Sequence, residues 1–414
     1  MDSDFQHAHW KKNLIGVWVS QILCMAGFSS IMPFIPLFIR DKYHITDERE
    51  LGMWVATLTF FSFCSYTVAT PIWGMVADKF GRKLMLLRAH YLAALLFPLM
   101  YFAPFLSPSV ACLVGIRTFA SLFSGVTNSA QTLVISTTPK EHHGVALGTL
   151  STAIWSGNMI GFLAGALFVN AFGYFWGFMC CGAMFLVGGV IIHIAVHENF
   201  VPPVKQAKGN AFVAFFRELT TSILLILVLF FAMGIARRLD EPYIALLVSK
   251  LAEPDKAIFF TGLISLVAAL GGMFSGIVTG KLCDRFDPVK VSIPAVLIAA
   301  ATMILQALSF NLWLLGGARF IHFTAAGGLE PAFLTMLARI VPEEKQGTIF
   351  GIASSVRFFG ILTSALLSGA IIWVFGNVRA VFFGSSILFL LLLPLILLAA
   401  ANIRKNNLKK EETV

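Results

Sequence analysis

The sequence predicts an all-α membrane protein in which twelve transmembrane helices form two pseudo-symmetric six-helix bundles. The first indication is composition, because 58% of the 414 residues are hydrophobic and only 12% are charged. Soluble proteins are about 45–50% apolar and about 25% charged. The other two indications are twelve apolar runs and a set of motifs that recurs in both halves. This composition excludes a soluble enzyme with one core, a disordered chain and a nucleic-acid-binding protein.

Each apolar run is long enough to cross a bilayer, which takes roughly 20 residues of helix. Because lipid offers no hydrogen-bond partners, each run must satisfy its own backbone polar groups and is therefore expected to be helical. An outer-membrane barrel would instead show alternating strands of ~10 residues. The expected spans are 13–39, 52–76, 84–104, 109–135, 145–170, 174–196, 218–248, 257–280, 290–309, 312–338, 347–374 and 379–402.

The loop lysines and arginines are distributed unevenly between the two sides. Most of them lie on the side that holds both termini, for example Lys79, Arg82, Lys83, Arg404 and Lys405. Because positively charged loops stay in the cytoplasm, both termini are expected there, in a multi-pass protein of the plasma (inner) membrane. This asymmetry accounts for most of the net charge of +9, which therefore does not indicate nucleic acid as a partner.

A hydrophilic stretch near the middle divides the sequence. Residues 197–217 contain Pro202 and Pro203 and are expected to form a cytoplasmic linker. The linker separates an N-terminal bundle, 1–196, from a C-terminal bundle with a short tail, 218–414.

The two halves also repeat each other. The sequence GMVADKFG at 74–81 recurs as GKLCDRFD at 280–287, and Arg117 recurs as Arg319 in the corresponding helix. Such repeats are typical of secondary transporters, whose substrate site lies near the membrane midplane between the halves.

These motifs resemble those of the major facilitator superfamily. The segment GMVADKFGRK at 74–83 resembles its loop 2–3 motif, and Gly27, Pro33 and Pro36 resemble the twelve-span drug:proton antiporter branch. The fifth span is similar to the antiporter glycine signature, although Phe162 stands where that pattern has proline. The resemblance implies transport by alternating access of the two halves. The glycines of the fifth span are Gly148, Gly157, Gly161 and Gly165.

The loop motif combines an acid with basic neighbours at a tight turn. A carboxylate at such a turn can pair with these neighbours or with a helix N-terminus and latch the cytoplasmic side. The alternative is a solvated loop that only sets orientation. The residues of the expected latch are Gly74, Asp78, Gly81 and Arg82, with Asp284 and Arg285 in the repeat.

Glycines spaced by four residues line one face of the fifth span. Gly157, Gly161 and Gly165 leave that face without side chains, so a neighbouring helix can approach closely. The face is either a surface on which the two halves hinge or a static packing seam.

Charged residues within spans are costly and are functional candidates by default. The eight that the spans contain are Arg117, Arg237, Arg238, Asp240, Glu241, Arg319, Glu330 and Arg357. The resemblance implies that the first, fourth, seventh and tenth spans line the cavity, which places seven of these charges there. The expected cavity residues are Gln21, Arg117, Asn128, Gln131, Arg237, Arg238, Tyr243, Arg319 and Arg357.

Local pairing offers another interpretation of the seventh-span charges. Arg237 and Arg238 stand four and three residues before Glu241, so both can pair with it on a helix and form a self-neutralised outer gate. At ~1.5 Å per residue, Glu330 and Arg357 lie at matching depths on antiparallel helices, so they can also meet.

Glu330 is the first candidate for proton coupling, and Asp240 and Glu241 are the second. A structural Glu330–Arg357 bridge is the alternative. His322 is either a proton relay or a neutral hydrogen-bonding histidine.

The sequence thus favours a proton-coupled exporter of small amphipathic compounds that works as a monomer in the lipid bilayer. The expected energy source is the proton gradient, with no cofactor and no metal. The alternative is a carrier for one defined metabolite, such as an organic anion, because five intramembrane arginines face three carboxylates. An enzyme is not expected, since the sequence has no HExxH, GxSxG or P-loop motif.

Overall fold

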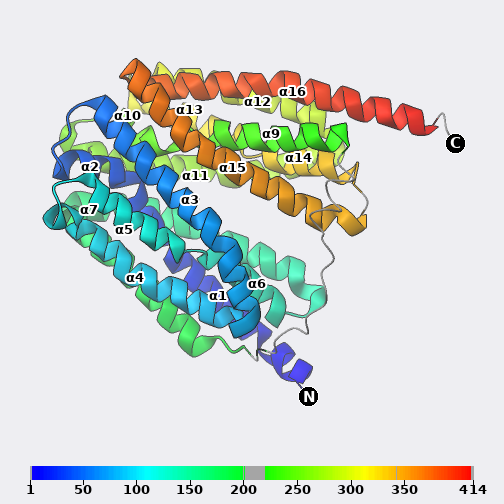
Figure 1. The fold of residues 1–414 in the computed structure, drawn as a ribbon, viewed down its shortest axis with the longest axis horizontal. Coiled ribbons are helices and arrows are strands. Elements are labelled where there is room, and N and C mark those ends of the chain that lie inside the picture. Colours follow the sequence, from blue (N-terminus) through cyan, green and yellow to red (C-terminus); the bar gives the residue numbers. More distant parts are fainter. Residues whose placement is uncertain (1, 199, 201–219, 342, 412–414) are drawn as a thin grey trace. The chain divides into compact units, whose positions relative to one another are not determined.

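The computed structural model describes residues 2–198, 200, 220–341 and 343–411, and every regular element in these ranges is a helix (Figure 1). Ten of the described helical segments are long and apolar enough to cross a membrane. Many large apolar side chains on them are exposed, among them Leu95, Phe105 and Ile194. Such apolar surface is expected where a protein faces lipid instead of water.

The chain divides by its internal contacts into two units. Unit 1 comprises Met1–Val204 and Ile244–Leu266, and unit 2 comprises Lys205–Tyr243 and Val267–Val414. Residues 244–266 therefore group with the N-terminal helices, whereas the sequence places them in the C-terminal bundle. Most of the predicted linker, 197–217, lies outside the described residues.

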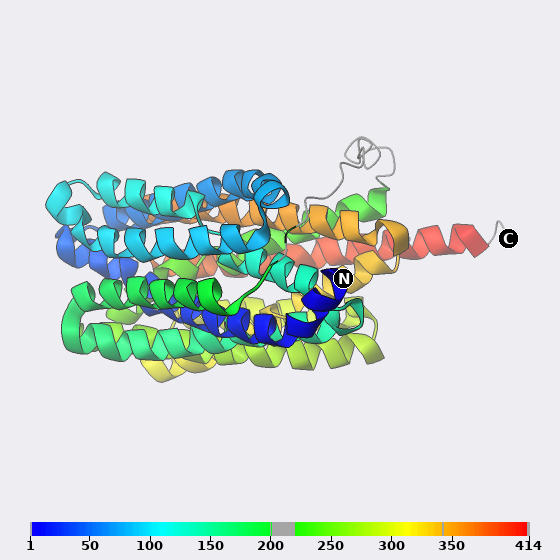
Figure 2. The same ribbon diagram turned by 90° about the horizontal axis from the view of Figure 1, so that it is seen from below.

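Unit 1 is organised around the contact between its first helix and its longest helix, α1 and α7. The chain reverses direction within α7 at Gly173, whose φ of 80° is outside the helical region (Figure 2). An ion pair between Glu48 and Lys250 connects residues 244–266 to α3. The elements are α1 (Asp2–Ile31), η1 (Met32–Phe34), α2 (Ile35–Lys42), α3 (Glu48–Phe80), α4 (Arg82–Leu106), α5 (Val110–Leu122), α6 (Val126–Thr137), η2 (Lys140–His142), α7 (His143–Ala195), α10 (Ile244–Ser249) and η4 (Pro254–Lys256).

Unit 2 is a helical bundle in which α9 packs against both α15 and α16 (Figure 1). Helix α11 begins in unit 1 and continues into unit 2. The elements are α9 (Thr221–Arg238), η3 (Glu241–Tyr243), α11 (Ala257–Arg285), α12 (Pro288–Ala307), α13 (Leu312–Ala326), α14 (Leu329–Ala338), α15 (Glu343–Phe375) and α16 (Arg379–Glu411).

The predicted spans are all present, but four of them are broken. The first is interrupted by η1, where Pro33 lacks a backbone donor, and the seventh by η3. The fourth breaks before Gly125, which has a φ of 108° that is strained for a residue with a β-carbon. The tenth breaks at Gly327 and Gly328. Each of these spans is helical on both sides of its break, and proline and glycine interrupt the helical hydrogen bonds there.

The difference between twelve predicted spans and ten candidate segments has two causes. Helix α7 is 53 residues long and holds the predicted fifth and sixth spans on either side of Gly173. Helices α13 and α14 have 15 and 10 residues, so neither reaches the roughly 20 residues that a span requires. The two together form the tenth span.

Three of the four predicted glycines bring α7 close to α1. A β-carbon at Gly157 would lie 2.6 Å from the carbonyl oxygen of Ile22, and one at Gly161 would lie 2.8 Å from the β-carbon of Ser29. Gly165 meets the backbone of Ser30 in the same way. Gly148 is exposed and a β-carbon there would meet no atom within 4 Å, so it lies off this face.

Candidate functional site

Three charged side chains from three helices meet in unit 2. Arg237 lies in the last turn of α9, Glu330 lies in the first turn of α14, and Arg357 lies in α15. Arg237 Nη1 is 3.4 Å from Glu330 Oε2, and Arg357 Nε is 3.3 Å from Glu330 Oε1. The predicted contact between Glu330 and Arg357 is therefore present, and Arg237 joins it. We call these three residues the arginine–glutamate triad.

Glycines explain why α9 and α15 approach closely enough to form the triad. A β-carbon at Gly234 would clash with the carbonyl group of Arg357, and one at Gly360 would clash with that of Phe231. Since Gly234 is one turn before Arg237, this close approach places the two guanidinium groups next to each other. The sequence reasoning missed this pair of glycines, although their position next to two intramembrane arginines is a visible signal.

A second carboxylate, Asp240, is enclosed in unit 2. It forms an ion pair with Arg319, and the two side chains are only 2% and 3% exposed. Gln306 Oε1 accepts a further hydrogen bond from Arg319 Nη1 at 3.0 Å. Asp240 and Arg319 are therefore buried structural partners in this conformation and do not line an open cavity.

The third carboxylate, Glu241, pairs with Arg238. The predicted i,i+4 contact between Arg237 and Glu241 is absent among the described ion pairs. Helix α9 ends at Arg238 and a 3-10 turn follows, so α-helical spacing no longer holds at Glu241. Arg237 pairs with Glu330 instead.

His322 is buried one turn after Arg319 on α13. Its Nδ1 lies 3.3 Å from the carbonyl oxygen of Ala299 and 3.4 Å from Thr302 Oγ1. The ring also packs against Phe323 and Phe389. This surrounding favours the hydrogen-bonding interpretation of His322 over the proton relay.

The intramembrane arginine of unit 1 has different surroundings. Arg117 on α5 lies near two aromatic rings, 5.6 Å from the Phe28 centroid and 5.5 Å from the Phe97 centroid. Its Nε is buried without a hydrogen-bond partner, and no described carboxylate forms an ion pair with it. Cation–π contacts partly stabilise a charge in such a place.

The remaining predicted cavity residues are scattered. Gln21 is buried and donates to Thr127 Oγ1 at 2.9 Å, and Asn128 donates to the Tyr66 hydroxyl at 3.0 Å. Gln131 is half-buried on α6. Tyr243 is fully buried and accepts a hydrogen bond from Ser368.

At the predicted latch, the structure shows a carboxylate that the sequence reasoning missed. Gly81 has a φ of 96°, as the predicted turn requires. Glu198 accepts the backbone N–H groups of Arg82 at 3.1 Å and Lys83 at 2.7 Å, so it caps the first turn of α4. In return, Lys83 Nζ donates to the carbonyl oxygens of His193 and Val196 at the end of α7. Glu198 stands directly after a span, and this position in the sequence was the available signal.

The remaining latch residues are only partly described. Gly74 and Arg285 are exposed, and the side chains of Asp78 and Asp284 lie outside those that the structure describes. In the second repeat, Asp287 replaces the turn glycine and caps α12 by accepting the N–H of Val289 at 2.9 Å. It also lies 3.9 Å from Arg339.

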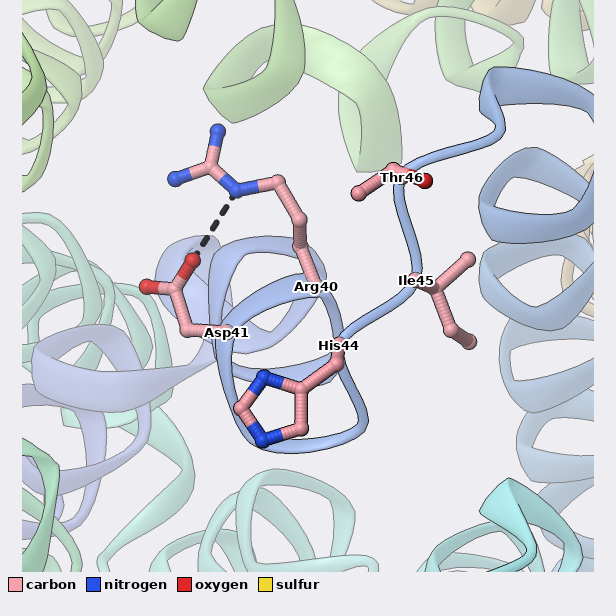
Figure 3. Close-up of a pocket in the computed structure, with 5 residues that line it drawn as sticks. All are labelled: Arg40, Asp41, His44, Ile45 and Thr46. Carbon is pink, nitrogen blue, oxygen red and sulfur yellow. Dashed lines mark hydrogen bonds and ion pairs between the residues drawn. The ribbon is translucent and has the colours of Figure 1, made fainter.

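A pocket beside the end of α2 is lined by Arg40, Asp41, His44, Ile45 and Thr46 (Figure 3). Its charges are satisfied locally, since Arg40 and Asp41 pair at 2.9 Å and Tyr174 donates to Asp41 at 2.9 Å. One short segment lines it, and none of the predicted site residues does.

The helices, the paired repeats and the intramembrane charges define a multi-pass membrane transporter. The family model described as Major Facilitator Superfamily matches residues 17–303 and 257–413. The chain belongs to this superfamily, as the loop and glycine motifs predict.

Curated relatives and solved structures agree with this assignment. The chain is 32% identical over 381 residues to the multidrug resistance protein MdtG of Salmonella dublin, covering 90% of this chain and 92% of that protein. It is also 32% identical to the Citrobacter koseri protein of that name, covering 90% and 91%. The nucleoside transporter NupG superposes with a TM-score of 0.77 at 11% identity, covering 94% of this chain and 98% of that one. A D-xylose–proton symporter gives a TM-score of 0.73 at 12% identity, covering 94% and 97%. These structures share the fold.

Proposed function

We propose that this transporter exports small amphipathic compounds by alternating access of its two halves, driven by the proton gradient. The name of the 32% identical relatives supports the class of substrate and does not favour a carrier dedicated to one metabolite. The arginine–glutamate triad supports coupling to the proton gradient, because it places one carboxylate between two cations on three helices.

The orientation and setting follow from the loop charges. Both termini face the cytoplasm, since the loops on their side hold most of the lysines and arginines. The protein lies in the inner membrane and acts as a monomer in contact with lipid and a small-molecule substrate. No cofactor takes part in this scheme.

Glu330 is the coupling residue in this proposal. Its side chain is 30% exposed, whereas that of Asp240 is 2% exposed and enclosed by Arg319 and Gln306. Glu241 is also accessible, but its partner Arg238 is only three residues away. A proton on Glu330 removes the charge that joins α9, α14 and α15, so protonation changes how these helices are held together.

The test is transport in proteoliposomes with an imposed pH gradient and the neutral dye N-phenyl-1-naphthylamine. We expect the wild-type chain to move the dye against its gradient and Glu330→Gln to lose the pH-driven component. Glu253→Gln removes an exposed carboxylate in unit 1 and serves as the matched control. Retention of pH-driven flux by Glu330→Gln refutes the coupling role, and absence of dye transport by the wild type refutes the proposed function.

A further inference from the structure

The intramembrane charges of unit 2 do not balance. Two of the three carboxylates are matched one to one, Asp240 with Arg319 and Glu241 with Arg238. Glu330 alone faces two cations, Arg237 and Arg357. The formal excess of one positive charge therefore lies at the triad.

The triad contains few hydrogen bonds among the described contacts, and one of its donors is buried without one. A guanidinium group carries five N–H donors, so the two arginines together offer about ten. Of these, Arg237 Nη1 donates to Glu330 at 3.4 Å, while Arg357 Nε lies 3.3 Å from Glu330 Oε1 but is buried without a well-formed hydrogen bond. Because unsatisfied donors in an apolar setting are costly, the arginines favour an additional acceptor.

The side chains of the triad are partly exposed. The side chains of Arg237, Arg357 and Glu330 are 28%, 21% and 30% exposed, in contrast with the enclosed Asp240–Arg319 pair. The ring of Phe358 lies 4.9 Å from the Arg357 guanidinium and adds an aromatic surface next to the charge. The excess positive charge, the guanidinium groups and the adjacent ring together match an anionic group on an apolar body.

From these observations we infer that Arg237 and Arg357 form a subsite for the anionic group of amphipathic organic anions, with Glu330 occupying it when no substrate is bound. This inference rests on the proposed function and specifies one substrate class for it. A planar carboxylate accepts two parallel N–H groups from a guanidinium, which is the geometry that arginine presents and lysine does not.

Export through this subsite does not depend on proton coupling at Glu330. The membrane potential is negative inside, so it favours outward movement of an anion by itself. The subsite and the coupling role can therefore fail separately, and binding measurements without a pH gradient isolate the subsite.

The test compares two ligands of the same shape, 2-naphthoate and the neutral 2-naphthamide, on the full chain in lipid nanodiscs by titration calorimetry. We expect the wild type to bind naphthoate about tenfold or more tightly than naphthamide, because hydrogen bonds to charged groups are about twice as strong as neutral ones. Arg237→Gln and Arg357→Gln should each bring the ratio toward one. Lys290→Gln removes an exposed cation from the same unit and should leave the ratio unchanged.

Glu330→Gln separates an occupied subsite from a general attraction to cations. Removing the internal carboxylate should tighten naphthoate binding several-fold and leave naphthamide binding as it was. Any one of three results overturns the inference. These are equal binding of naphthoate and naphthamide by the wild type, a preference that survives both arginine changes, and binding of naphthoate by Glu330→Gln that equals that of the wild type. Naphthamide binding and the thermal transition show that each variant is folded. Arg357→Lys keeps the charge but loses the planar donors, so it should retain part of the preference for naphthoate.

The outcomes also separate this inference from the proposed function. Export of N-phenyl-1-naphthylamine without a preference for naphthoate leaves the function and refutes the subsite. A preference for naphthoate without export of the dye refutes the proposed function and leaves the subsite.

Discussion

Asp240 and Arg319 form an ion pair that closes off the interior of unit 2. Asp240 follows the end of α9 and Arg319 lies in α13, so the pair joins two broken spans. Both side chains are nearly inaccessible, and Gln306 from α12 accepts a further hydrogen bond from Arg319. Arg319 is also the counterpart of Arg117 in the sequence repeat, yet Arg117 has aromatic rings where Arg319 has a carboxylate. The repeat therefore conserves an arginine while its partner differs between the units.

Asp240→Asn should destabilise the protein strongly, because it leaves Arg319 buried without its counter-charge. Breaking a buried ion pair on one side costs about 3–5 kcal/mol. The measurement is the thermal transition of the purified protein in detergent. The double variant Asp240→Asn with Arg319→Gln should recover part of the loss, since it removes both charges. An unchanged transition for Asp240→Asn alone would show that the pair does not stabilise the fold.

The sequence predicts the helices well because hydropathy acts over whole spans. Twenty apolar residues determine a span almost independently of their neighbours, whereas breaks such as the one at Gly327 and Gly328 depend on local backbone geometry. The small-residue contact on one face of α7 is also predictable, because a spacing of four is a property of a single helix.

The site is only partly predictable, for physical reasons. The Glu330–Arg357 contact follows from the depth of two antiparallel helices. The contact of Arg237 with Glu330 does not follow from depth, because it depends on where α9 ends and on the close approach at Gly234 and Gly360. Tertiary contacts of this kind override the local i,i+4 pairing with Glu241.

Glu198→Ala should loosen the connection between α4 and α7. The carboxylate accepts two backbone N–H groups at the start of α4, and losing a cap of this kind costs about 1 kcal/mol. The thermal transition should therefore fall by about 1–2 °C, because the shift per kcal/mol becomes smaller as a chain becomes longer. Glu253→Gln, which removes one side of the exposed pair with Lys256, is the control and should have little effect. Equal transitions for both variants would argue against a capping role for Glu198.

Asp78→Asn tests the latch directly. Asp78 lies in the last turn of α3, next to the Gly81 turn that Glu198 secures. If its carboxylate latches the transporter, the variant should lose dye transport while its abundance in the membrane stays normal. Asp255→Asn, an exposed acid in η4, is the matched control. Unchanged dye flux in Asp78→Asn would contradict the latch. The loop would then act only in setting the orientation of the protein in the membrane.

Gly161→Ala should distinguish a packing seam from a hinge on α7. The new β-carbon would press against α1 at Ala26 and Ser29, and overpacking of this kind costs about 1–3 kcal/mol. Gly148→Ala on the same helix is the control, because a β-carbon there meets nothing within 4 Å.

Both helices of this contact belong to unit 1, which favours the seam. A seam predicts that Gly161→Ala lowers the thermal transition while each folded molecule transports the dye at the wild-type rate. A hinge predicts that, besides the lower transition, transport per folded molecule is lost. Measuring both quantities on the same preparation decides between the two, because a change in the amount of folded protein affects only the total flux.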